Sequence, residues 1–375
     1  MKKTVAFLLC IILVLCCLAG CSANQTVNVS YQSEVFQQLQ SGEKEKYSGV
    51  TLNVFNWGEY ISDGKGGSLN VNRIFEKLTG IKVNYLFYDS NETMYSKLKS
   101  GGISYDIIIP SDYMIQRLIS EDMLQKLDFS KLDNYKNISD EYKNLYFDPN
   151  NEYSVPYSVG MVGLIYNETM IDEVPDSWGV MWDEKYKNNV LTFNNPRDAF
   201  AIAQFYLGQD INSTNQADWD KAAEKLKEQK PILQSYVMDE VFDKMEGEEA
   251  AIAPYYAGDY LSMAENNENL KFVYPKEGTN IFVDSICVPK NAQNFDAAML
   301  YINFLLEAQI ALQNAEYIYY ATPNAAVLEL DDYSLKDNEY LYPAEDKKPK
   351  TQYFHDLDSK TRSYYEKLWE QVKLD

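Results

Sequence analysis

The alternation of strand-like and helix-like segments constrains the fold more than any other feature of the sequence. Residues 50–55 alternate apolar and polar side chains, as a strand does, and residues 71–78 repeat apolar side chains at helical spacing before Gly80, a natural helix end. Residues 81–87 alternate again, and residues 93–99 fit a second helix. This rhythm is typical of a mainly parallel sheet that helices cover on both faces.

The rhythm continues through the rest of the chain. Residues 106–110 fit a short buried strand, residues 115–119 begin a helix, and a similar rhythm resumes after Pro156. Residues 297–312 fit one long apolar helix, and residues 361–372 fit a C-terminal helix that docks by one apolar stripe. The length of 375 residues predicts two domains.

The first residues indicate export. Lys2 and Lys3 precede the apolar run 5–18, which is too short to span a bilayer and has the size of a signal-peptide core. The run ends in Leu18-Ala19-Gly20-Cys21, which resembles the lipobox of bacterial lipoproteins. That resemblance implies cleavage before Cys21 and a diacylglycerol on its thiol, with an uncleaved anchor as the alternative.

We therefore expect a signal peptide over residues 1–20, then a lipidated N-terminus and flexible tether over residues 21–47. The protein would be extracytoplasmic, on the cell surface or in the periplasm, and held to the membrane only by the lipid on Cys21. Cys287 would be the one unmodified cysteine left, so no disulfide and no cysteine metal cluster is expected. It lies in an apolar run and fits a buried strand.

The charge balance limits the partners. The sequence has 34 Lys and Arg against 56 Asp and Glu, a formal net charge of −22. Phosphate binding needs basic surfaces, so this balance argues against nucleic acid. Acidic side chains instead favour cations in clefts, although an acidic surface without a cation site has the same composition.

The turns after the first and third strands are the places to look for a ligand, because a parallel sheet binds ligands beyond the carboxyl ends of its strands. Residues 56–60 and 110–113 carry aromatic and polar side chains at these turns. Bulky aromatic side chains are poor loop formers but good walls for a ligand.

From about residue 52 to 324, a series of segments resembles the bacterial spermidine/putrescine-binding proteins of ABC transporters, in family order. The segments are FNWGEY at 55–60, YDSNETMYSKL at 88–98, YDIIIPSDY at 105–113, YSVPY at 153–157, PKEG at 275–278, FVDS at 282–285, INFLL at 302–306 and YATPN at 320–324.

The resemblance implies an α/β fold of the type II periplasmic-binding-protein class, with two lobes, each a mainly parallel sheet flanked by helices, and a ligand in the cleft between them. The implied lobes are residues 48–157 with 286–320, and residues 158–285 with 321–375. Crossovers are expected near residues 157–160, 284–287 and 320–322.

The resemblance also implies a function: capture of a polyamine, putrescine or spermidine, and its delivery to the permease of an ABC importer. No enzymatic activity, cofactor or metal is implied, and we expect a monomer. A polyamine is a chain of methylenes with ammonium groups, so it needs carboxylates for the charges and aromatic faces for the chain and the cations.

Carried over one at a time, the family's ligand residues fall on Trp57, Tyr60, Ser111, Tyr113, Asp284 and Tyr320. Asp284 matches the carboxylate that grips an amine. Phe282 stands where the family has Trp, and Tyr256 replaces another Trp in a Tyr-Ala-Gly-Asp sequence. That sequence resembles the putrescine-selective branch, which makes Asp259 a candidate for the second amine.

Asn195 and Asp198 stand where the spermidine branch has two acids, so one acid is missing, and this difference favours putrescine over spermidine. Structural alternatives remain for several of these residues. Trp57 fits a core residue, Asp284 a strand-end cap, Asp198 a helix cap and Asp259 the cap of a helix over residues 260–264.

Three neighbouring residues are assigned no ligand contact. We expect Trp178 and Trp182 to pack in the core, and Arg197 to organise nearby acids.

Other functions remain to be weighed. The sequence contains no Gly-x-Ser-x-Gly, His-Glu-x-x-His or P-loop motif, and the only histidine, His355, fits a surface position. A hydrolase with a carboxylate pair is one alternative, and a sensor that signals to a membrane partner is another. The main rival is a ferric-ion or other cation receptor, because Tyr255-Tyr256 and Tyr319-Tyr320 resemble the tyrosine pairs of iron-binding relatives.

Overall fold

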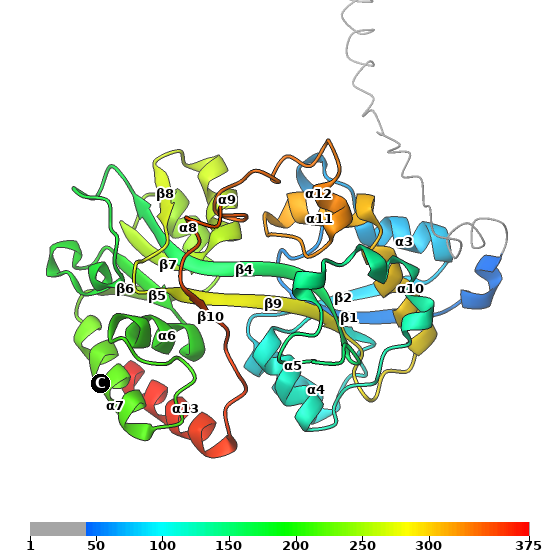
Figure 1. The fold of residues 1–375 in the computed structure, drawn as a ribbon, viewed down its shortest axis with the longest axis horizontal. Coiled ribbons are helices and arrows are strands. Elements are labelled where there is room, and N and C mark those ends of the chain that lie inside the picture. Colours follow the sequence, from blue (N-terminus) through cyan, green and yellow to red (C-terminus); the bar gives the residue numbers. More distant parts are fainter. Residues whose placement is uncertain (1–42, 375) are drawn as a thin grey trace, which may run out of the picture. The chain divides into compact units, whose positions relative to one another are not determined.

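Two long strands, β4 (Ser154–Asn167) and β9 (Thr279–Cys287), lie antiparallel at the centre of the sheet (Figure 1). Their register runs from Ser154 opposite Cys287 to Met161 opposite Ile281. The computed structural model describes residues 43–374. The expected signal peptide, Cys21 and most of the tether lie outside the described residues.

On one side of this central pair, β1 (Thr51–Trp57) lies between β2 (Lys82–Tyr88) and β3 (Ile107–Ile108) in parallel, and β3 meets β9. We call these strands and their helices the first lobe. The helices are α3 (Val71–Thr79), α4 (Asn91–Ser100), α5 (Asp112–Ser120), α10 (Phe295–Leu305), α11 (Ala308–Ile318) and α12 (Ala325–Leu328).

On the other side, β5 (Val190–Phe193) lies parallel to β6 (Leu233–Val237) and β7 (Ile252–Tyr256), while β7 and β8 (Leu270–Val273) pair antiparallel with β4. We call these strands and their helices the second lobe. The helices are α6 (Pro196–Tyr206), α7 (Gln216–Gln229), α8 (Glu240–Glu246), α9 (Ala257–Asn266) and α13 (Ser359–Leu374).

The remaining elements are short. Strand β10 (Thr351–Gln352) pairs with β9 in parallel. The 3-10 helices are η1 (Glu43–Tyr47), η2 (Lys65–Gly67), η3 (Phe129–Lys131), η4 (Asp133–Asn137), η5 (Asp140–Tyr142), η6 (Trp178–Trp182) and η7 (Glu184–Tyr186). The expected parallel pairing is thus found in the outer strands of both lobes, and the central strands are antiparallel.

Local sequence explains where several helices begin and end. The side chain of Asn70 caps α3, and Gly80 ends it at φ 79°, a conformation that glycine adopts without a steric cost. Helix α13 docks as its apolar stripe predicts, because the ring of Tyr365 stacks on Trp219 with 4.9 Å between centroids and Trp369 packs near Phe200.

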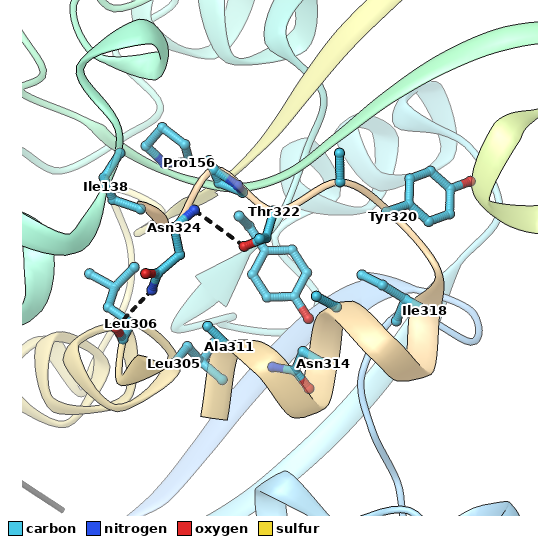
Figure 2. A pocket seen from close by; sticks show the side chains of 14 residues that line it. Ile138, Pro156, Leu305, Leu306, Ala311, Asn314, Ile318, Tyr320, Thr322 and Asn324 are labelled. Carbon is cyan, nitrogen blue, oxygen red and sulfur yellow. Dashed lines mark hydrogen bonds between the residues drawn. The ribbon is translucent and has the colours of Figure 1, made fainter. Parts of the chain in front are cut away.

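The expectation of one long helix over residues 297–312 is wrong. The chain breaks after α10, and α11 leaves at an angle of 76°. The carbonyl of Leu306 in the break accepts a hydrogen bond of 3.0 Å from the side-chain amide of Asn137. It accepts another of 2.9 Å from the side-chain amide of Asn324 (Figure 2). Two distant segments therefore satisfy a carbonyl that a continuous helix would have bonded internally.

Among the described residues, no single helix combines the length and apolar character needed to cross a membrane. Helices α10 and α11 meet that test only as the bent pair.

The two tryptophans assigned to packing lie as expected. Trp178 is buried, and its indole N–H donates to the carbonyl of Gly278 at 2.8 Å. Trp182 is half-buried and stacks on Tyr206 with 5.0 Å between ring centroids. Cys287 is fully buried in β9, as its apolar neighbours predict.

Candidate functional site

A cavity of about 1020 Å³ opens between the two lobes. The carboxyl ends of parallel strands supply much of its wall, as the topology predicts: Trp57 ends β1, Ser111 follows β3, Asn195 follows β5 and Tyr256 ends β7. Every residue of the expected binding set lines this one cavity, namely Trp57, Tyr60, Ser111, Tyr113, Asn195, Asp198, Tyr256, Asp259, Phe282, Asp284 and Tyr320.

Asp284 lies inside β9 and is 3% exposed, so it is not a strand-end cap. Its Oδ2 accepts a hydrogen bond of 2.8 Å from the hydroxyl of Tyr60. Its Oδ1 is buried and has no hydrogen-bond partner among the residues that the structure describes. Burial raises the pKa of Asp284 to about 7, because a carboxylate in this place has lost most of its water. The carboxyl group therefore has an acceptor atom free for a cationic donor.

Asp198 lies in the first turn of α6, where three polar groups meet. The cap of this helix is Asn195, whose Oδ1 accepts from the backbone N–H of Arg197 at 3.0 Å, so the cap alternative for Asp198 is wrong. Asp198 Oδ2 accepts from Asn195 Nδ2 at 2.7 Å and from the Tyr256 hydroxyl at 2.9 Å. Burial raises its pKa to about 7.

Asp259 lies in the first turn of α9, which begins at Ala257, so Asp259 is inside the helix and does not cap it. It is half-buried, and the hydroxyl of Tyr320 donates to its Oδ2 at 3.1 Å. Loss of water raises the pKa of Asp259 to about 7. A Cβ on neighbouring Gly258 would lie 2.4 Å from the ring of Tyr320, so only glycine admits this ring.

Four rings, which we call the aromatic box, line the same cavity as these acids: Tyr60, Tyr256, Phe282 and Tyr320. Ring centroids are 5.4 Å apart for Tyr60 and Tyr320, and 5.4 Å apart for Tyr256 and Phe282. Both pairs meet edge to face, a favourable geometry for aromatic rings. The box thus offers rings to a ligand chain, and its three tyrosines hold the three aspartates.

Trp57 stands beside the box, half-buried. Its indole N–H donates to the carbonyl of Ile109 at 3.0 Å, and its ring lies 4.7 Å from that of Tyr88. The indole is therefore fixed on one side by protein contacts, while the residue also lines the cavity.

Ser111 and Tyr113 are held by a residue that sequence reasoning did not single out. Asn91 Nδ2 donates to Ser111 Oγ at 3.1 Å and to the Tyr113 hydroxyl oxygen at 3.2 Å. The Tyr113 hydroxyl donates in turn to Glu92 at 3.0 Å.

Arg197 is built into the second lobe. Its guanidinium donates to Asn212 Oδ1 at 2.9 Å and to the carbonyl of His355 at 3.2 Å, and it lies 4.6 Å from the ring centroid of Phe354. These contacts go to an amide, a carbonyl and a ring. The expected role of Arg197 in organising nearby acids is therefore limited to the electrostatic effect of its positive charge. His355 itself is exposed, as predicted.

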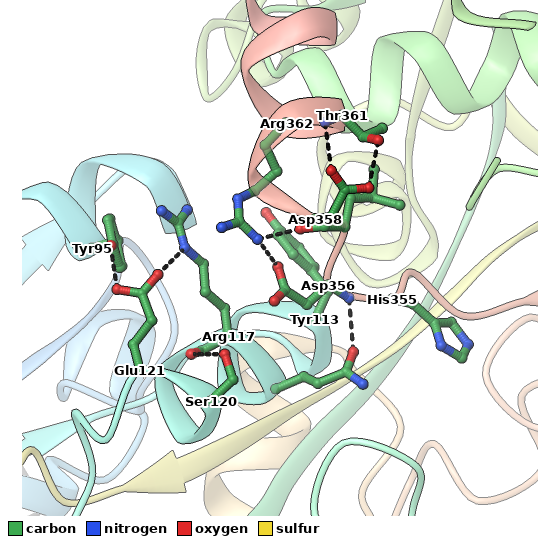
Figure 3. A network of polar contacts seen from close by, with 12 residues as sticks. Tyr95, Tyr113, Arg117, Ser120, Glu121, His355, Asp356, Asp358, Thr361 and Arg362 are labelled. Atoms are coloured by element: carbon green, nitrogen blue, oxygen red, sulfur yellow. Dashed lines mark hydrogen bonds and ion pairs between the residues drawn. The ribbon is translucent and has the colours of Figure 1, made fainter. Parts of the chain in front are cut away.

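Phe354 also lines the cavity, and no sequence signal pointed to it. It belongs to a C-terminal segment that contacts both lobes: Asp356 N–H donates to Gln116 Oε1 at 2.7 Å, and Asn212 Nδ2 donates to the carbonyl of Tyr353 at 2.8 Å. Arg362 on α13 binds Asp356 from the other side (Figure 3).

Further acids around the cavity add to its negative potential. Asp239 lines it, and burial and the nearby charges of Glu240, Asp89 and Glu59 raise the pKa of Asp239. A cavity of this kind attracts cations.

The residues described here contain no group of three or more His, Cys, Asp and Glu that is placed to hold a metal ion. Nor do the tyrosine pairs converge in one set of ligands. The hydroxyl of Tyr256 donates to Asp198 and that of Tyr320 to Asp259, whereas Tyr319 interacts with Glu265.

Comparisons with known proteins place the chain in a family. Residues 72–341 match the family model described as bacterial extracellular solute-binding protein. The spermidine/putrescine-binding periplasmic protein of Salmonella typhimurium is 36% identical over 324 residues, 85% of this chain and 91% of that protein. The putrescine-binding periplasmic protein PotF of Escherichia coli is 30% identical and aligns with 86% of this chain and 91% of its own length.

A solved structure agrees. The spermidine/putrescine substrate-binding protein PotD of Streptococcus pneumoniae is 37% identical, with a TM-score of 0.72 over 87% of this chain and 99% of that one. This match confirms the expected α/β periplasmic-binding-protein fold, and the family match confirms a binding protein in place of an enzyme. The chain therefore belongs to the bacterial extracellular solute-binding protein family.

Proposed function

We propose that this protein binds a polyamine, putrescine or spermidine, in the cavity between its lobes and delivers it to an ABC importer. The observation that carries the proposal is the combination of Asp198, Asp259 and Asp284 around the aromatic box. Relatives named for spermidine and putrescine support it.

The chemistry of the cavity suits a chain with positive ends. A carboxylate withdrawn from water is unfavourable alone and gains most from a cation that hydrogen-bonds to it. Asp284 Oδ1 is the clearest acceptor for one ammonium group because it accepts no hydrogen bond from any residue in the described part of the chain. The rings cover the methylenes and attract the cations, each worth about 0.5–2 kcal/mol. Micromolar affinity needs about 8 kcal/mol in total, which two paired carboxylates and several rings supply.

A diamine is favoured over a triamine. Asp259 with Tyr320 offers a second ammonium site in the second lobe, as in the putrescine branch that the sequence resembles. The spermidine branch has an acid at the position of Asn195. In this chain the side-chain Nδ2 of Asn195 donates a hydrogen bond to Asp198. One acceptor for a further ammonium group is therefore absent from this wall.

As a member of an extracellular solute-binding family, the protein acts outside the cytoplasm. We propose further that Cys21 carries a diacylglycerol that holds it to the membrane, as a monomer beside its permease. Cys21→Ser should release the protein from the membrane fraction, and mass spectrometry of the N-terminal peptide should lose the lipid mass. An unmodified Cys21 in the membrane-bound protein would refute the anchor.

Titration calorimetry tests the function. Putrescine and spermidine should each bind with one site per chain, and neutral sugars should give no heat. Ferric iron is the main alternative ligand. Visible absorbance distinguishes it from an amine, because phenolate–iron coordination would colour the protein. Visible absorbance with ferric iron, and no heat with either amine, would replace the polyamine proposal by the iron receptor.

A further inference from the structure

The edge of the cavity already holds an ammonium group that belongs to the protein. Lys65 Nζ lies 3.3 Å from Glu59 Oε1 and 3.0 Å from Asp63 Oδ2. Lys65 and Glu59 line the same cavity as Asp284, and their side chains are 66% and 69% exposed. We use the name cavity rim for three lining residues, Glu59, Lys65 and Tyr317, and for Asp63, which does not line the cavity but contacts Lys65 and Tyr317.

Tyr317 connects the rim to the aromatic box. Its hydroxyl donates to Asp63 Oδ1 at 2.9 Å and lies 3.5 Å from Glu59 Oε2. Its ring packs against the cluster that contains Tyr60, Phe282 and Tyr320. The ammonium group of Lys65 therefore meets two carboxylates beside aromatic rings, the same chemistry that the interior offers to an amine.

The backbone keeps Lys65 in this place. Its own N–H donates to Asp63 Oδ1 at 2.9 Å, and Gly64 and Gly66 on either side have φ of 91° and 59°. These left-handed conformations favour glycine, and they turn the chain so that the lysine returns toward Asp63. Lys65 is thus a tethered aliphatic amine held at the open edge of a cavity for aliphatic amines.

We propose that Lys65 is a specificity-determining residue, whose ammonium group occupies the rim acids Glu59 and Asp63 and so favours a diamine over polyamines with further ammonium groups. This inference rests on the proposed function. The two ammonium groups of a diamine pair with the interior aspartates and do not need the rim acids. A longer polyamine that extends to the rim must displace the Lys65 ammonium group from these acids or be repelled by its positive charge.

Lys65→Ala tests the proposal by the change in preference. Calorimetry at one pH and salt concentration should show spermidine and spermine binding about three- to fivefold more tightly, the scale of one exposed ion pair, and putrescine changing by less than about twofold. Lys82→Ala is the matched control. Lys82 is equally exposed and paired with Glu76 at 3.4 Å, but it is not among the cavity residues, so it changes net charge alone.

Two further variants test whether the positive charge at position 65 and the rim acid Glu59 cause the effect. Lys65→Arg should retain the wild-type preference, and Glu59→Gln added to Lys65→Ala should remove the gain for the longer amines. An equal gain for putrescine and spermidine, or a ratio that matches Lys82→Ala, would overturn the inference while the proposed function stands. If the wild-type protein binds no polyamine, the proposed function fails and this inference falls with it.

Discussion

The hydroxyl of Tyr60 donates a hydrogen bond of 2.8 Å to Asp284, a residue 224 positions away in the sequence. The bond joins the turn after β1 to the interior of β9, where one oxygen of the carboxyl group is bound and the other has no hydrogen-bond partner within residues 43–374. The same pairing of a phenol with an aspartate recurs for Tyr256 with Asp198 and for Tyr320 with Asp259. Each tyrosine orients a carboxyl group and leaves its ring in the wall.

Asp284→Asn should weaken putrescine binding more than tenfold. The amide keeps an acceptor for the Tyr60 hydroxyl but loses the charge that an ammonium group requires. Calorimetry measures the change. Asp176→Asn is the control, because Asp176 is 74% exposed, pairs with Lys276 and does not line the cavity. Equal affinities for wild type and Asp284→Asn would remove this carboxylate from the site.

Affinity for a diamine should rise as pH increases from about 5.5 to 8. Asp198, Asp259 and Asp284 have pKa values of about 7 in the ligand-free protein and must be ionised to pair with ammonium groups. Binding should therefore release protons near neutral pH, seen as a binding enthalpy that depends on the ionisation enthalpy of the buffer. A pH-independent affinity over this range would contradict the assignment.

The same pKa shifts predict how the stability of the ligand-free protein depends on pH. The raised values, about 7 in the folded state against 3.8 for an ordinary aspartate, mean that the folded state binds more protons between these values. The contribution of these groups to stability is therefore complete below about pH 4 and is lost as pH rises through 7. Thermal unfolding with and without putrescine should show that the amine restores stability most strongly above pH 7.

Tyr60→Phe should lower affinity and stability together. The ring stays in the box, but Asp284 Oδ2 loses its donor, and a buried acceptor left without a partner costs about 1–3 kcal/mol. Tyr364→Phe is a matched control, since the Tyr364 hydroxyl also donates to an aspartate, Asp220, but on the exposed surface. A Tyr60→Phe protein that unfolds and binds like Tyr364→Phe would contradict the role of this bond.

Gly258→Ala should disturb the proposed second ammonium site at Asp259. The added methyl group would approach the ring of Tyr320 to 2.4 Å, so the ring must move away from Asp259. We expect at least about a tenfold loss of putrescine affinity if this movement costs about 1.4 kcal/mol or more. Gly102→Ala is the control because no atom lies within 4 Å of its Cβ position. Unchanged affinity would show that Asp259 does not need Tyr320 in place.

The sequence predicted those parts of the molecule that local patterns determine. Trp57 and Ser111 were predicted at the ligand site because they stand at the ends of strands, and Asp259 and Asp284 were predicted from the family resemblance. All four line the cavity. Long-range contacts determined the parts that sequence reasoning missed. At the break after α10, the carbonyl of Leu306 is bound by Asn137 and Asn324, contacts that no local pattern predicts.

Two details of the cavity wall were also missed, one because of long-range contacts and one because of a local signal. Phe354 reaches the cavity because its segment is fastened to Gln116 and Asn212, both far away in the sequence. A helix cap was the structural alternative for Asp198, but Asn195 stands directly before Pro196 and caps α6. A proline at the first helical position was the local signal that favoured Asn195.

The most direct test of the central claim is a crystal structure of the protein with putrescine. The account predicts the diamine among the rings of Tyr60, Tyr256, Phe282 and Tyr320, with one ammonium group within hydrogen-bond distance of Asp284 Oδ1. A putrescine bound elsewhere, or with its ammonium groups away from all three aspartates, would contradict it.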